Sequence, residues 1–112
     1  MMLSSKKCAP CEGGIPPLPY GKIKKLAKET PTWQIAEEYK IRKLIKDYEF
    51  KDFSEAMEFV NKVADIAESE DHHPNIFVRD WNKVKLEIYT HKIRGLHEND
   101  FILAAKIDTI SA

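Results

Sequence analysis

The chain has 112 residues, of which 43% are hydrophobic and 32% are charged. These values fit one globular domain with a core of its own, and they argue against a disordered chain or a membrane-spanning protein. The 18 basic and 18 acidic residues give a formal net charge of zero, so the chain lacks the overall basic charge of many nucleic-acid-binding proteins. We therefore expect neither a nucleic acid nor a membrane among its direct partners.

Residues 1–20 differ from the rest of the chain because they are rich in proline and glycine. We expect them to form a flexible extension outside the core, followed by one folded domain over residues 21–112. The pair Cys8-Ala9-Pro10-Cys11 supplies only half the ligands of a structural zinc site, and no βαβ pattern surrounds it. Free thiols in a mobile tail are therefore favoured over metal or redox chemistry. The start of the chain shows no apolar run typical of a secretory signal, so a cytoplasmic location is expected.

The first half of the domain predicts one short helix and two strands. Over residues 20–29 apolar side chains recur at helical spacing until Thr30-Pro31, where the residue before proline is pushed out of the helical region. Residues 33–39 alternate in hydrophobicity, and residues 41–50 are rich in β-branched and aromatic side chains. We expect two strands here, joined by a turn at residues 38–40.

A longer helix is predicted in the middle of the chain. Asp52 is followed three residues later by Glu55, a variant of the capping box that starts many helices. Apolar residues then repeat at helical spacing, which predicts a helix over residues 53–70. Pro74 prevents this helix from continuing.

Two further strands and a last helix complete the domain. Residues 76–81 are rich in apolar residues, and residues 84–90 show the cleanest alternation in the chain. The last helix follows Gly95-Leu96 and carries Asp100 in its first turn. The order α-β-β-α-β-β-α indicates an α+β fold, with a single antiparallel four-stranded sheet and helices packed on one face. The other face is expected to meet solvent or a partner chain.

The histidines form the first functional signal. They all lie between residues 72 and 97, namely His72, His73, His91 and His97. Histidine exchanges protons near neutrality because its ordinary pKa is about 6.5. Glu68 and Asp71 fall at the C-terminal end of the predicted helix, where the helix dipole disfavours anions by ~0.3–1 kcal/mol each. We infer that these acids serve a purpose other than helix stability.

A pocket is predicted where the long helix ends, provided that the strand over residues 84–90 lies beneath it. The residues expected around it are His72, His73 and His91, with Glu68, Asp71 and Asp100 as nearby acids. Carboxylates beside imidazoles hold particular tautomers, an arrangement that suits general acid and base catalysis.

Several of these residues also have a structural interpretation. His72 can interact favourably with the dipole at the end of its helix, and Asp100 can be a capping carboxylate of the last helix. His97 stands where the N-cap of that helix is expected, which favours a structural role. Histidine and carboxylate ligands would also suit zinc or iron, but no His-x-x-x-His or Glu-x-x-His spacing occurs within a helix. Proton transfer without a metal is therefore the favoured hypothesis.

Short motifs in the same region match one protein family. They are Glu68-x-x-x-His72-His73-Pro74, Asn82-Lys83-Val84, Thr90-His91, Gly95-Leu96 and Asp100. In this order they closely resemble pterin-4a-carbinolamine dehydratase, also called 4a-hydroxytetrahydrobiopterin dehydratase. The resemblance extends upstream through Trp33 and Phe50-Lys51-Asp52-Phe53, and so covers about residues 20–110.

The resemblance implies a lyase that dehydrates a 4a-hydroxytetrahydropterin to the quinonoid dihydropterin. This step recycles tetrahydrobiopterin after an aromatic amino-acid hydroxylase, a possible partner in the pathway, has used its pterin. The resemblance implies neither a metal nor an organic cofactor. It also implies a homodimer or a homotetramer.

The resemblance further implies a role for each site residue. His73 is expected to be the base that faces ring nitrogen N5, while His72 and His91 protonate and hold the departing hydroxyl. The other implied site residues are Glu68 and Asp100, which orient the histidines, and Asp71, Pro74 and Thr90, which bind the pterin.

Two positions depart from the family pattern. Trp81 stands where members often have tyrosine, and His97 stands where they usually have serine or threonine. Relatives of this fold also include binding partners of a transcription factor and assembly chaperones. A protein-binding module is therefore the alternative function.

Overall fold

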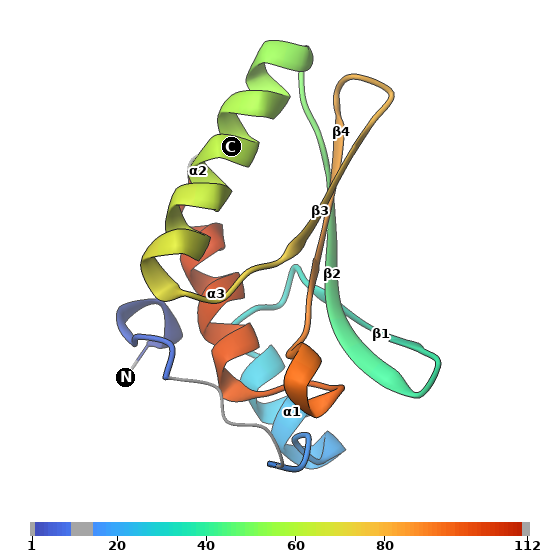
Figure 1. Ribbon diagram of the computed structural model, residues 1–112, viewed down its shortest axis with the longest axis vertical. Coiled ribbons are helices and arrows are strands. Elements are labelled where there is room, and N and C mark those ends of the chain that lie inside the picture. The colour runs from blue at the N-terminus through green and yellow to red at the C-terminus, as the bar shows by residue number, and fades with distance from the viewer. Residues whose placement is uncertain (1, 10–14, 111–112) are drawn as a thin grey trace.

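A computed structural model describes residues 2–9 and 15–110 (Figure 1). Within these ranges the helices and strands follow the predicted order. Their bounds are α1 (Tyr20–Ala27), β1 (Gln34–Glu38), β2 (Ile41–Glu49), α2 (Phe53–Glu70), β3 (Asn75–Arg79), β4 (Lys83–Ile88) and α3 (Glu98–Asp108). Two short 3₁₀ helices are added, Leu3–Ser5 and His91–Ile93.

The strands form one four-stranded antiparallel sheet in the order β1-β2-β4-β3. Tyr39 and Lys40 turn the chain between β1 and β2 with φ angles of 52° and 65°, the left-handed conformation that a two-residue hairpin turn requires. The predicted turn at residues 38–40 is therefore confirmed. Asp80 and Trp81 also have positive φ angles, 47° and 52°, so the strand predicted over residues 76–81 ends at Arg79.

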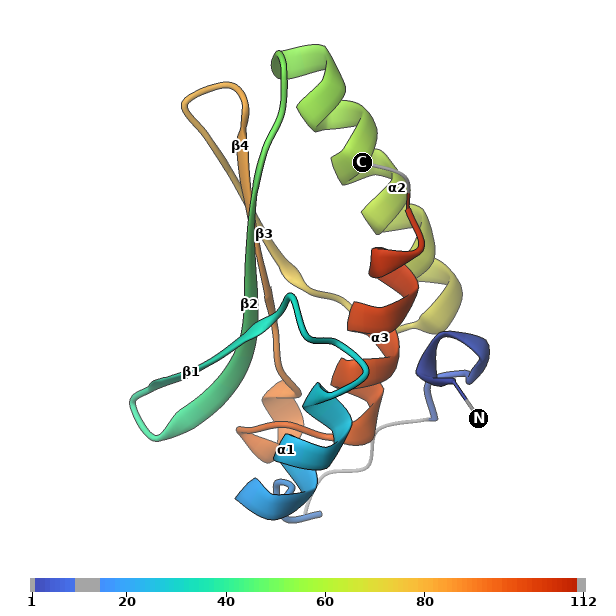
Figure 2. The ribbon, with the colours of Figure 1, turned by 180° about the vertical axis from the view of Figure 1, so that it is seen from behind.

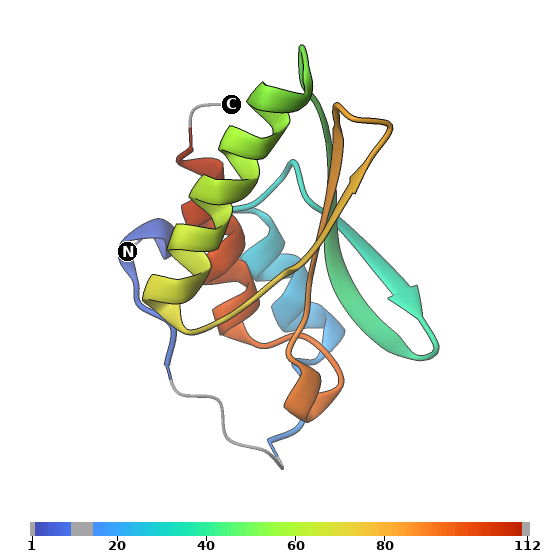
Figure 3. The ribbon, with the colours of Figure 1, turned by 45° about the horizontal axis from the view of Figure 1, so that its top comes forward.

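The helices α2 and α3 cover one face of the sheet, as the sequence predicted (Figures 1, 2 and 3). The core lies between these two layers. Alternate side chains of each strand point to the same face of the sheet, and those on the face covered by the helices pack against them. Fully buried residues fill it from both sides. They include Leu44, Leu86 and Ile88 from the sheet and Val63, Phe101 and Leu103 from the helices. Within the described ranges no helix covers the opposite face of the sheet.

Helix α2 begins and ends where the sequence predicted. The Asp52 side chain accepts a hydrogen bond from the Glu55 backbone N–H at 2.8 Å, which caps the first turn. Asp71 ends the helix in the left-handed conformation, with φ 51°. Among the described residues no helix, α2 included, is long and apolar enough to cross a membrane.

Helix α3 is buried along most of its length, because α2, the sheet and the N-terminal segment all pack against it. His97 is its N-cap and accepts a hydrogen bond from the Asn99 N–H on Nδ1 at 3.1 Å. Asp100 Oδ2 accepts from the His97 N–H at 2.8 Å, which completes a capping box. The structural role expected for His97 is therefore confirmed.

The N-terminal segment differs from the prediction of an extension outside the core. Leu3 is only 2% exposed and belongs to the hydrophobic core, so the prediction is wrong for the part of the chain around it. Further along, the Leu18 N–H donates to the Leu96 carbonyl at 2.9 Å. Cys11 lies outside the described residues. The boundary between residues 1–20 and 21–112 stays a prediction.

Candidate active site

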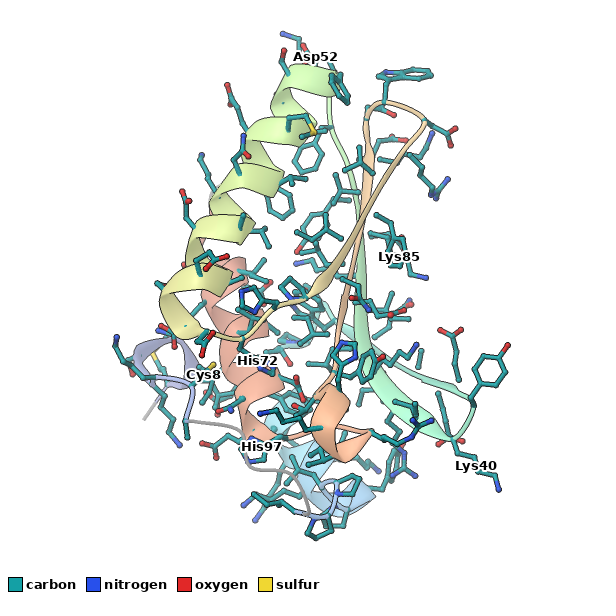
Figure 4. All side chains as sticks on the ribbon, in the orientation of Figure 1. Cys8, Lys40, Asp52, His72, Lys85 and His97 are labelled. Atoms are coloured by element: carbon teal, nitrogen blue, oxygen red, sulfur yellow. The ribbon has the colours of Figure 1, made fainter. Side chains whose placement is uncertain are left out.

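A pocket of about 490 Å³ opens where the end of α2, the end of β4 and the N-terminal segment meet. Figure 4 shows Cys8 and His72 close to the C-terminal end of α2. The residues lining the pocket are Cys8, Ala9, Glu70, Asp71, His72, His73, Pro74, Asn75, Tyr89, Thr90, His91 and Lys92. The pocket therefore gathers chain segments that lie far apart in the sequence.

His72 is held by a buried carboxylate. Its Nε2 lies 2.7 Å from Oδ1 of Asp100, whose side chain is fully buried. The other carboxylate oxygen accepts from the Thr90 hydroxyl at 2.9 Å and from the His97 N–H. Because an ionised carboxylate can only accept, this contact favours the His72 tautomer with a proton on Nε2, and it leaves Nδ1 as the nitrogen that faces a bound molecule.

Asp100 makes both of the contacts that the two alternatives for it imply. It caps α3 through the His97 N–H, and it contacts His72 in the pocket. His72 directly follows Asp71, the C-cap of α2, so it lies at the end of the helix as the dipole alternative expects, and its ring also faces Asp100.

His73 lies in a more open environment than His72. Its side chain is 54% exposed, and its Nε2 lies 3.6 Å from Oε1 of Glu68, which is 80% exposed. Exposed ion pairs of this kind are weak. Glu68 does not line the pocket, so its influence on the site passes through His73.

His91 follows β4 and begins the 3₁₀ helix His91–Ile93. Its ring packs against the Tyr89 ring with the centroids 4.2 Å apart. The Lys43 ammonium lies 5.0 Å from the centroid of the Tyr89 ring, at cation–π distance. Tyr89 therefore supports His91 at one side of the pocket.

A polar cluster on the uncovered face of the sheet stands behind Tyr89. Glu87, a charged residue of β4, is only 7% exposed. The Asn75 amide donates to Glu87 Oε1 at 2.9 Å, and the Lys43 ammonium lies 3.5 Å from the same oxygen. These partners explain the burial of the charge.

The predicted site residues thus come together at one place. Six of them line the pocket, namely His72, His73, His91, Asp71, Pro74 and Thr90. Glu68 and Asp100 stand behind His73 and His72. Their roles in substrate binding and catalysis stay predictions.

Other pocket residues were missed by the sequence reasoning, above all Cys8, Glu70 and Tyr89. The Glu70 side chain is 6% exposed, and it accepts from the Cys8 backbone N–H at 2.8 Å. Burial, together with the Glu70 charge, raises the pKa of the Cys8 thiol to about 12. No signal in the sequence links two residues so far apart, although the run of acids at the end of α2 marked the region.

Within residues 2–9 and 15–110, no group of three or more histidine, cysteine, aspartate or glutamate side chains is arranged to hold a metal ion. The pocket instead presents imidazole rings, carboxylates and the Thr90 hydroxyl. These groups can donate, accept and transfer protons.

The sequence model of the pterin 4 alpha carbinolamine dehydratase family matches residues 16–110. The chain belongs to this family. The resemblance found in the sequence is therefore confirmed, and it covers both the sheet and all eight predicted site residues.

Individual members of the family are similar over nearly the whole chain. A protein of Rickettsia canadensis, named as a candidate pterin-4-alpha-carbinolamine dehydratase, is 52% identical over 109 residues, which are 96% of this chain and 96% of that protein. A protein of Rubrobacter xylanophilus with the same name is 41% identical over 108 residues, 96% of this chain and 97% of its own length.

Solved structures show the same fold. The crystal structure of a transcriptional coactivator/pterin dehydratase from Brucella melitensis matches with a TM-score of 0.72 and 29% identity, over 82% of this chain and 95% of that chain. A pterin dehydratase-like RuBisCO assembly factor of the alpha-carboxysome matches with a TM-score of 0.57 and 20% identity, over 69% of this chain and 86% of that chain. At that identity the second match shows the fold alone.

Proposed function

We propose that this protein dehydrates a 4a-hydroxytetrahydropterin, the pterin-4a-carbinolamine, to the quinonoid dihydropterin and water. The observation that carries the proposal is the convergence of His72, His73 and His91 on one pocket, with Asp100 holding the first of them. Membership of the dehydratase family supports the same activity.

The reaction moves two protons and breaks one bond. A base takes the proton from N5, the electron pair left on N5 forms the double bond to C4a, and the C4a–O bond breaks. The hydroxyl accepts a proton and leaves as water. No electrons pass to a second molecule, so the reaction requires neither an oxidant nor a reductant, and proton transfer is the catalysis that it needs.

The surroundings of the histidines support a division of these tasks. His73 is open to the pocket and to solvent, so it can take the N5 proton and pass it to water. His72 is fixed through Nε2 by Asp100, which leaves Nδ1 for the departing hydroxyl. His91, packed on Tyr89, is assigned to hold that hydroxyl. Asp71, Pro74 and Thr90 line the pocket and are assigned to pterin binding.

We place this activity in tetrahydrobiopterin recycling, beside an aromatic amino-acid hydroxylase in the cytoplasm. We also propose that the protein is a homodimer or a homotetramer. Light scattering on the purified protein separates these two states from each other and from a monomer.

A protein-binding role is the second candidate. It is favoured by the similarity to the Brucella melitensis protein, which is described as a transcriptional coactivator/pterin dehydratase. In addition, three large apolar side chains are exposed at or near the β3–β4 hairpin and at the start of α2, namely Phe53, Phe77 and Trp81. A stable complex recovered from cell extract, with no dehydratase activity, would favour this role over the enzyme.

The activity is tested by replacing the proposed base. We expect His73→Ala to lose at least about two orders of magnitude in kcat, the effect of removing a general base. His97→Asn keeps a residue that can cap α3 and lies outside the pocket, so it serves as the matched histidine control. If His73→Ala kept full activity, the role assigned to His73 would be wrong.

A further inference from the structure

The segment Met2–Ala9, here called the N-terminal strap, lies beside α3 and beside the C-terminal end of α2 (Figures 1 and 3). Leu3 anchors it in the core, and the Leu3 N–H donates to Glu29 Oε1 at 3.0 Å. Both contacts hold the start of the strap against the domain. The other end of the strap reaches the pocket, where Cys8 and Ala9 are lining residues.

The buried side chain of Asn99 forms hydrogen bonds with the end of the strap. Asn99 is 2% exposed. Its Oδ1 accepts from the Ala9 N–H at 2.9 Å, and its Nδ2 donates to the Ala9 carbonyl at 2.7 Å. The amide thus pairs with the strap backbone as a neighbouring strand would. Without the strap this amide would lose both of these hydrogen bonds.

Two charged residues of the domain also contact the strap backbone. Glu70, at the end of α2, accepts from the Cys8 N–H at 2.8 Å. Lys106, on α3, donates to the Ser4 carbonyl at 3.1 Å and lies 3.8 Å from Glu70 Oε2. Helices α2 and α3 therefore both hold the strap in place.

The same turn of α3 serves the strap and the site. Asn99 holds Ala9, and the next residue, Asp100, holds His72. The position of the strap and the position of His72 are thus set by adjacent residues of one buried helix turn. Cys8 and Ala9 line the pocket that also contains His72 and His73.

We propose that the N-terminal strap is a wall of the pterin pocket, with Ala9, fixed by Asn99, as a specificity-determining residue that limits how the substrate sits against the histidines. This inference rests on the proposed function. A wall residue contacts the substrate before and during the reaction, so its replacement changes KM more than kcat.

The first test enlarges the wall. Ala9 is exposed, so Ala9→Trp should fold while its indole intrudes on the pocket, and Lys7→Trp places the same side chain on an exposed strap residue that does not line the pocket. We expect Ala9→Trp to raise KM for the pterin carbinolamine at least tenfold with kcat within about twofold, and Lys7→Trp to match the wild type. Identical KM values for the two variants would overturn the proposal.

The second test does not depend on turnover. In a Cys11→Ser background, the rate of Cys8 alkylation by iodoacetamide reports the docked strap, because docking partly buries the Cys8 thiol and so raises its pKa. We expect saturating 7,8-dihydrobiopterin, a stable isomer of the product, to slow this alkylation severalfold, and Asn99→Ala to speed it at least tenfold.

The two tests separate the two claims. The proposal for the strap alone is overturned if the wild type is active, the pterin does not change the rate of Cys8 alkylation, and Ala9→Trp has the same kinetics as Lys7→Trp. An inactive wild type whose Cys8 is nevertheless protected by the pterin overturns the reaction and keeps the strap as a wall of a pterin site. An inactive wild type without protection overturns both.

Discussion

His72 and Asp100 are 28 residues apart in the chain, yet His72 Nε2 lies 2.7 Å from Asp100 Oδ1. His72 follows the end of α2, and Asp100 lies in the first turn of α3. The contact therefore joins the end of one helix to the start of another. The carboxylate that closes the capping box of α3 is also the group that fixes a site histidine.

Asp100→Asn tests this contact. The amide carries no charge, so it no longer favours the His72 ring that is protonated on both nitrogens and gives its Nδ1 proton to the departing hydroxyl. We therefore expect kcat to fall by about two orders of magnitude. Asp108→Asn makes the same change at the exposed end of α3, where Asp108 contacts Trp33 and Lys46, and should leave kcat unchanged. Steady-state kinetics on the pterin carbinolamine compare the two. Equal kcat values for both variants would refute the role of Asp100.

Glu68→Gln tests the second acid–histidine pair. Because the Glu68 and His73 side chains are mostly exposed and 3.6 Å apart, we expect kcat/KM to fall at most about fivefold, the range of exposed ion pairs. The difference should shrink further at high salt, which screens exposed charges. A loss of a hundredfold or more would mean that Glu68 takes part directly in the reaction.

The stability of the protein should fall at alkaline pH through Cys8. Burial and Glu70 raise the pKa of the folded-state thiol from 9.0 to about 12. The unfolded chain therefore releases the thiol proton first, and the stabilisation is complete below pH 9 and decreases as the pH rises from 9 towards 12. Urea unfolding at pH 8 and pH 10.5 should show a larger loss for the wild type than for Cys8→Ser. Equal losses would show that Cys8 is not buried in solution.

Gly95 and Gly21 form a matched pair for the packing of the N-terminal region. A Cβ on Gly95 would lie 2.7 Å from Pro17 Cβ, whereas a Cβ on Gly21 would meet nothing within 4 Å. We expect Gly95→Ala to destabilise the fold by about 1–3 kcal/mol. Gly21→Ala, in α1, should stabilise it by about 0.5–1 kcal/mol. Chemical denaturation measures both. A neutral Gly95→Ala would show that Pro17 does not pack there.

The elements that the sequence predicted well are those that carry a local signal. Asp52 and Glu55 mark the start of α2 and Pro74 limits its end, so both bounds of the helix were found. Asp80 and Trp81 carry no glycine signal, and the turn that they form was predicted as strand. His97 stands directly before α3, which is also a local signal, and it was assigned correctly as the N-cap of that helix.

Contacts between distant segments left no such signal. The sequence placed His72 and Asp100 in one site, but their direct contact depends on how α2 and α3 pack. Leu3 and Cys8 belong to residues 1–20. The proline and glycine content of that stretch predicted an extension, whereas both residues pack against the domain. Tyr89 lies within the strand predicted over residues 84–90, and its contact with His91 arises because the chain turns into a 3₁₀ helix after β4.

We propose that this pocket dehydrates a pterin carbinolamine through its histidines. The most direct measurement follows the appearance of quinonoid dihydropterin from 4a-hydroxytetrahydrobiopterin with increasing amounts of the purified wild type and of the double variant His72→Ala/His73→Ala. We expect a rate proportional to the wild-type concentration and no acceleration by the double variant. No acceleration by the wild type, or equal acceleration by both proteins, would contradict it.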